Sequence, residues 1–138
     1  MATVITTPKP PLNIFDVVRV TATDVATEIY DVPTYVIPAD GPVAEREVGA
    51  AAILTNAVIA NLTAGAATAA IWVLDTESTQ FYLAQSLTVE QDGYIKVDLD
   101  KQILQSGERL FVQMGAGGSA EVHLSFVLNQ REEFTIIV

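Results

Sequence analysis

The chain has 138 residues, of which 50% are hydrophobic and 17% are charged, and its formal net charge is -10. This length fits a single domain with one core, and the apolar content excludes a wholly disordered chain. The acidic balance argues against partners that are nucleic acids or anionic membrane surfaces, because both carry negative charge.

Targeting signals and cysteine chemistry have no support in the sequence. No apolar run approaches the roughly 20 residues that a membrane-spanning helix needs, and no apolar stretch after Lys9 resembles a signal sequence. We therefore expect synthesis in a cytoplasm. The chain has no cysteine, which excludes disulfides, thiolate metal sites and cysteine catalysis, so stability must come from packing and backbone pairing.

We interpret residues 1–14 as an extended arm that precedes one domain over residues 15–138. Proline in the arm removes backbone donors and favours an extended chain. Such an arm is either a frayed terminus or a segment that becomes ordered on a neighbouring subunit. In the second case, the interface candidates in the arm are Pro8, Pro10, Pro11, Leu12 and Ile14.

Alternation of apolar and polar residues predicts a series of short strands, because successive side chains of a strand point to opposite faces. The predicted strands are Phe15–Ala22, Thr27–Val32, Tyr35–Ile37, Ala51–Leu62, Thr68–Leu74, Phe81–Val89, Tyr94–Leu99, Leu110–Met114, Ala120–Leu128 and Phe134–Val138. Lys101–Gln105 is predicted to form a single helical turn. Ala51–Leu62 also fits the start of a helix, but we favour a strand with strict alternation along its length.

The alternation also predicts which side chains point into the core. The inward residues are expected to be Val18, Val20 and Ala22, then Ile95, Val97 and Leu99, then Leu110, Val112 and Met114, and finally Ala120, Val122, Leu124, Phe126 and Leu128. In Ala51–Leu62, strict alternation places Ile53, Thr55, Ala57, Ile59 and Asn61 on one face.

Glycine, proline and acidic residues predict the turns between these strands. Asp40-Gly41-Pro42 predicts a loop that extends through Glu47, and Asp92-Gly93 predicts a tight turn. Thr63–Ala66 predicts a hairpin turn before Thr68–Leu74, and Gly115–Ser119 predicts a flexible loop within a Leu110–Leu128 hairpin. Many short strands without an amphipathic helix predict an all-β fold, a two-sheet antiparallel β-sandwich of jelly-roll or immunoglobulin-like type.

Catalytic patterns are absent, and we predict a protein that is not an enzyme and has no cofactor. The single histidine, His123, alternates with Glu121 and Ser125 on an outward strand face, without the Gly-x-Ser-x-Gly turn of a serine hydrolase. The Gly115–Ser119 loop lacks the lysine and the following helix of a phosphate-binding loop. Asn61-Leu62-Thr63 matches a glycosylation sequon, which has no meaning without a secretory route.

Metal binding also has little support. One histidine without cysteine does not form a usual zinc ligand set. Asp92, Asp98 and Asp100 supply three carboxylates, but their spacing fits no EF-hand loop. Ordinary solvated carboxylates and a cation site between subunits both stay open, and we predict no metal.

Trp72 lies on an apolar strand, which is more typical of a core or interface anchor than of a sugar-binding platform. We therefore include Trp72 among the interface candidates. A carbohydrate-binding β-sandwich module stays an alternative, and several exposed aromatic residues beside Trp72 would favour it.

The order of segments from Ile29 to Val127 forms a further pattern. Its segments are Ile29-Tyr30-Asp31-Val32-Pro33, Val58-Ile59-Ala60-Asn61, Ala70-Ile71-Trp72-Val73, Phe81-Tyr82-Leu83, and Leu104-Gln105-Ser106-Gly107-Glu108 before Arg109-Leu110-Phe111-Val112. This order resembles small virion structural proteins of tailed bacteriophages.

The resemblance implies a β-sandwich that oligomerises, as a trimer or a ring, and binds major capsid or tail proteins in the virion. It implies capsid decoration (cement) as the leading role. A neck, tail or baseplate component that contacts other tail proteins or the host surface is the alternative role.

Overall fold

The computed structural model describes residues 4–5, 12–100, 102–130 and 136–137, and the described residues form strands and turns without a helix. Among these residues, accordingly, no helix is long and apolar enough to cross a membrane. The strands are β1 (Val4–Ile5), β2 (Leu12–Ala22), β3 (Thr27–Asp31), β4 (Thr34–Ile37), β5 (Arg46–Asn61), β6 (Ala67–Leu74), β7 (Gln80–Val89), β8 (Tyr94–Asp98), β9 (Ile103–Gln105), β10 (Arg109–Met114), β11 (Ala120–Gln130) and β12 (Ile136–Ile137).

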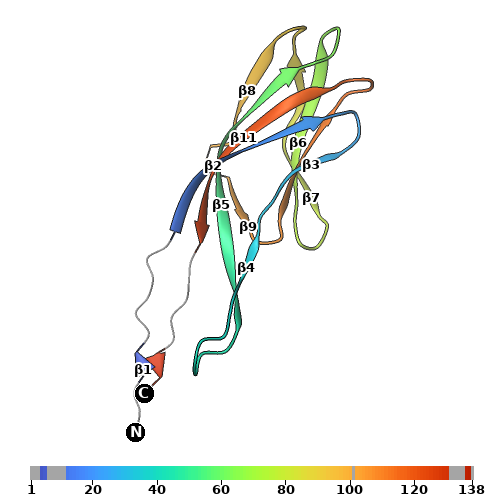
Figure 1. The fold of residues 1–138 in the computed structure, drawn as a ribbon. Coiled ribbons are helices and arrows are strands. Elements are labelled where there is room, and N and C mark those ends of the chain that lie inside the picture. The colour runs from blue at the N-terminus through green and yellow to red at the C-terminus, as the bar shows by residue number, and fades with distance from the viewer. Residues whose placement is uncertain (1–3, 6–11, 101, 131–135, 138) are drawn as a thin grey trace.

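Two antiparallel sheets pack face to face as a β-sandwich (Figure 1). The six-stranded sheet has the order β2-β11-β5-β4, and β5 also pairs with β9 and β8 along the edge that it shares with β4. The four-stranded sheet has the order β3-β10-β6-β7. Most connections cross from one sheet to the other, so the sandwich is jelly-roll-like.

The core lies between the two sheets and is almost wholly apolar. The residues predicted to point inward contribute to it. Leu110, Val112 and Met114 of β10 point into it from the four-stranded sheet. Val122, Leu124 and Phe126 of β11 point into it from the other sheet. The inward predictions for β2 and for Tyr94–Leu99 are confirmed in the same way, since Ala22 and Leu99 are buried and their partners pack against the core.

Two predicted hairpins are wrong. β5 and β6 lie in different sheets, and so do β10 and β11, so the turns after Asn61 and after Met114 carry the chain across the sandwich. The paired neighbours are instead β4 with β5 and β6 with β7. Alternation predicts the face of a side chain but not the partner of its strand, and a crossing turn uses the same residue types as a hairpin turn.

The strict alternation predicted for Ala51–Leu62 is also wrong. The pairing of β5 with β11 shifts between Ser125 and Phe126, so that Thr55 is an extra residue opposite this step. A β-bulge of this kind reverses the alternation beyond it. Ala52 and Leu54 point inward before the bulge and Ala57 and Ile59 after it, which leaves Ile53 on the outside.

Smaller differences concern strand ends. Ile103–Gln105 forms β9 on the edge of β5 instead of part of a helical turn, and Lys101 lies outside the described residues. The loop predicted through Glu47 is shorter, because β5 begins at Arg46 and pairs with β4. Of Phe134–Val138, the structure describes only β12, which pairs with β1.

Candidate functional site

An apolar row crosses the outer face of the six-stranded sheet. Phe15 on β2 pairs with Val127 on β11, Val127 with Ile53 on β5, and Ile53 with Ile103 on β9. Phe15 is 83% exposed and Ile103 is 54% exposed, while the two central residues are half-buried. We call these four residues the apolar row. Contiguous exposed apolar residues of this kind are typical of surfaces that bind a partner.

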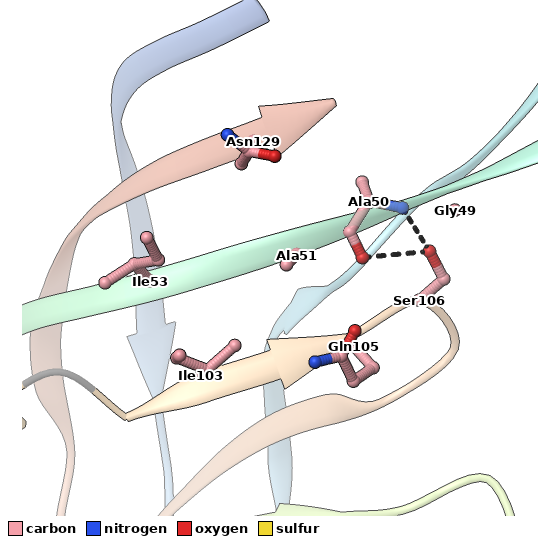
Figure 2. Close-up of a pocket in the computed structure, with 8 residues that line it drawn as sticks. All are labelled: Gly49, Ala50, Ala51, Ile53, Ile103, Gln105, Ser106 and Asn129. Carbon is pink, nitrogen blue, oxygen red and sulfur yellow. Dashed lines mark hydrogen bonds between the residues drawn. The ribbon is translucent and has the colours of Figure 1, made fainter. Parts of the chain in front are cut away.

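A groove of about 620 Å³ adjoins one end of the apolar row (Figure 2). The residues that line it come from β5, β9, β11 and the turn after β9: Gly49, Ala50, Ala51, Ile53, Ile103, Gln105, Ser106 and Asn129. Ile53 and Ile103 therefore belong to both features.

Ser106 fixes one end of this groove. Its Oγ accepts a hydrogen bond from the N–H of Ala50 at 2.6 Å and lies 3.1 Å from the carbonyl oxygen of Ala50 (Figure 2). It also donates to the carbonyl oxygen of Pro33 at 2.9 Å. One side chain thus joins the start of β5, the entry to β4 and the turn after β9. The hydrogen bonds of Ser106 to backbone groups therefore hold this wall of the groove in place.

The outer face carries few charges. Arg19 and Lys96 point outward beside Glu121 and Asp98, and Glu47 of β5 is exposed on the same side near the start of its strand. Because the whole chain has a net charge of -10, most of the excess negative charge lies elsewhere on the chain. His123 lies between Arg19 and Val58, outward as predicted but half-buried instead of fully solvated.

The outer face of the other sheet carries a ladder of aromatic rings. Trp72 stacks on Phe111 with ring centroids 5.7 Å apart and packs on Tyr82 at 5.8 Å. Arg109 lies over Phe111 at 5.4 Å and contacts Glu28 at 3.5 Å. Trp72 itself is only 6% exposed, whereas Tyr82 is 51% exposed.

The aromatic rings of this ladder cover one another, so their faces are not exposed in the way that stacking against a sugar ring needs. A groove of about 230 Å³ lies beside Trp72 and Tyr82, but Tyr82 is the only strongly exposed ring next to it among the described residues that line it. Phe81, the residue before Tyr82 on β7, is also 55% exposed, so the carbohydrate-binding module stays an alternative.

The other interface candidates lie on or before β2. Ile14 is half-buried and packs against the core, and Leu12 is the first residue of β2. Pro8, Pro10 and Pro11 lie outside the described residues. Their part in an interface stays a prediction, as does that of Trp72. Sequence analysis missed the apolar row, because the bulge at Thr55 places Ile53 on the opposite face from Ala57 and Ile59.

The carboxylates and the sequon have structural roles. In the part of the chain that the structure describes, no group of three or more histidine, aspartate or glutamate residues lies close enough to hold a metal ion. Asp98 accepts a hydrogen bond from the N–H of Asp100 at 2.9 Å. Asn61 is 7% exposed, and its side-chain amide bonds to backbone groups.

No family model and no curated protein matches this chain. Among solved structures, a chain of Bacillus endospore appendages, described as disulfide-linked pili, is 10% identical over 96% of this chain and 97% of its own, with a TM-score of 0.49. A chain of infectious bursal disease virus, strain Gx, is 11% identical over 96% of this chain and 39% of its own, with a TM-score of 0.40. A chain of the T13 IBDV viral particle is 11% identical over 94% of this chain and 37% of its own, with a TM-score of 0.37. Similarities this low carry no argument about function.

Proposed function

We propose that this protein is a non-catalytic structural subunit that assembles with copies of itself. The observation that supports the proposal is the apolar row with its adjoining groove, on a face that carries few charges. A chain with a net charge of -10 repels its own copies over most of its surface, so this face is the one best suited to self-association. The chain has no cysteine, so disulfides would have no part in its assembly.

The proposal extends to the virion of a tailed bacteriophage, with capsid decoration as the leading role. This part is supported by the resemblance of the Ile29–Val127 segment order, and the structural comparisons add nothing specific to phages. On a particle, many identical copies bind symmetric sites, and repetition raises the effective affinity of individually modest contacts. A neck, tail or baseplate position is the alternative.

Sedimentation over a dilution series in the micromolar range tests self-assembly. We expect a species heavier than the 14.8 kDa chain that dissociates on dilution. A single species of the chain mass at every concentration would contradict the proposal.

Mass spectrometry of purified virions with copy counting tests the location. Copy numbers in the hundreds support capsid decoration, whereas about a dozen or fewer support a neck or tail position. Absence of the protein from purified virions would exclude a virion role and leave self-assembly to the sedimentation test.

A further inference from the structure

We propose that a second copy of this chain docks on the outer face of the six-stranded sheet, with the Phe15 ring of each copy seated in the groove of the other. This inference rests on the proposed self-assembly and names the surface that carries it. Three observations support it: the shape of the face, its size and the protection of the neighbouring sheet edge.

The shape of the face is self-complementary. Phe15 is a projecting ring at one end of the apolar row, and the groove beside Ile53 and Ile103 is a hollow at the other end. The row spans four strands, so the two features lie about three strand spacings, or roughly 14 Å, apart. A twofold axis parallel to the strands, between β11 and β5, places each ring opposite Ile103 at the rim of the other copy's groove.

The size of the face suits a stable pair. Four strands across and the 11 residues of β11 along the sheet correspond to about 700 Å². A standard protein interface buries roughly 800 Å² on each partner. The face is therefore large enough for a specific pair without a contribution from another surface.

The charges of the face are mixed in this arrangement. With the same twofold axis, Val17 of one copy lies opposite Asp98 of the other, and Arg19, one pair further along the strand, lies opposite Lys96. The carboxylate of Asp98 is the nearest counter-charge to both cations, one pair away from each. Between described residues, neither Arg19 nor Lys96 has an ion-pair partner within its own chain.

The free edge of β2, beside Phe15, is poorly suited to the addition of a strand from a second copy. The outer face of the six-stranded sheet suits packing better. Asp16 accepts a hydrogen bond from the N–H of Val17 at 2.8 Å, which occupies a donor that an added strand would need. Charged side chains on edge strands are a common protection against edge-to-edge pairing. We therefore favour a second copy on the face over strand addition at this edge.

Chemical crosslinking at a single introduced cysteine tests the proposal, because the chain has no cysteine of its own. Ser125 on β11 and Asn56 on β5 are paired neighbours on either side of the proposed axis. Ser125→Cys or Asn56→Cys should each link to the same residue of the second copy with the shortest bis-maleimide reagent. The matched control is Gln85→Cys, which is exposed on β7 of the other sheet and should stay unlinked.

The expected result is a crosslinked dimer for both face variants, and its loss when Phe15→Thr is added. If the unmodified protein sediments as an assembly but both face variants give no more dimer than Gln85→Cys, the face-to-face pair is wrong and the proposed self-assembly stands. If the unmodified protein sediments as a single chain at every concentration, both proposals fail.

Discussion

At the scale of the residue, Asn61 holds together two turns at one end of the sandwich. Its Nδ2 donates to the carbonyl oxygens of Gly65 at 2.8 Å and Val89 at 3.0 Å and lies 3.2 Å from that of Glu90. Its Oδ1 accepts from the N–H of Thr63 at 2.7 Å. One buried amide thus satisfies backbone groups from two loops, which fits a structural role for this asparagine.

Replacement of Asn61 tests this role. Asn61→Ala removes the side-chain donor to the carbonyls of Gly65 and Val89, whereas the carbonyl of Glu90 keeps the N–H of Gly93. An unsatisfied buried group of this kind costs about 1–3 kcal/mol in unfolding free energy. Asn61→Asp should lower the unfolding free energy, relative to the unmodified chain, more at pH 7 than at pH 4. An ionised carboxylate has no proton to donate to the carbonyl oxygens. Denaturant midpoints measure both, with Asn56→Ala on the outer face as the control, expected within about 0.5 kcal/mol of the unmodified chain. Equal midpoints for all variants would contradict the assignment.

Tyr30 gives the stability of the protein a dependence on alkaline pH. The ring packs on Phe126 with centroids 4.4 Å apart. Burial, and then the neighbouring Tyr35, Asp16 and Asp31, raise the pKa of the Tyr30 hydroxyl to about 12. The unfolded chain therefore loses this proton first, near the ordinary value of 10.0.

The stabilisation from neutral Tyr30 is accordingly complete below pH 10 and is lost as the pH rises from about 10 to about 12. We expect the unmodified protein to lose more stability over this range than Tyr30→Phe does. Denaturant unfolding at several pH values measures the difference. Parallel declines for the two proteins would contradict the role of Tyr30.

At the scale of the element, edge strand β2 presents the exposed apolar ring of Phe15 on its outer face, while Asp16 protects its unpaired edge. Asp16 has the same phase as the inward-facing Ile14 and Val18, yet it is exposed and bonds to the N–H of Val17. An alternating sequence with valine at this position would present a long unprotected edge. We therefore expect this single carboxylate to limit strand addition between copies.

Asp16→Val should convert a limited assembly into larger aggregates. The control Thr21→Val adds a similar apolar group to an exposed outward position of the same strand without releasing a backbone donor. Light scattering against concentration distinguishes the two variants. If both behave as the unmodified protein does, Asp16 does not protect the edge.

The elements also show how far sequence reasoning extends. Alternation predicted the inward faces of β2, β10 and β11, because a buried face excludes polar residues along the whole strand. It did not predict that β10 and β11 belong to different sheets, since pairing depends on contacts far apart in the chain. It also missed the bulge at Thr55, which no local residue preference signals, and with it the apolar row through Ile53.

At the scale of the whole molecule, the two sheets divide the outer surface into unlike halves. The ring ladder around Trp72 is covered by its own neighbours, whereas the apolar row leaves Phe15 and Ile103 exposed. An exposed apolar row on a face with few charges is typical of a surface that binds a partner. The central claim is that this row carries the assembly.

Sedimentation equilibrium of the double variant Phe15→Thr, Ile103→Thr tests this claim most directly. Both changes place threonine, which suits a strand, at exposed positions, so the unfolding free energy should change little. The control is Phe81→Thr, a residue that is 55% exposed on β7 of the other sheet. The account predicts that the double variant sediments as a folded single chain of about 14.8 kDa while the control still assembles. A double variant that assembles as strongly as the control would contradict it.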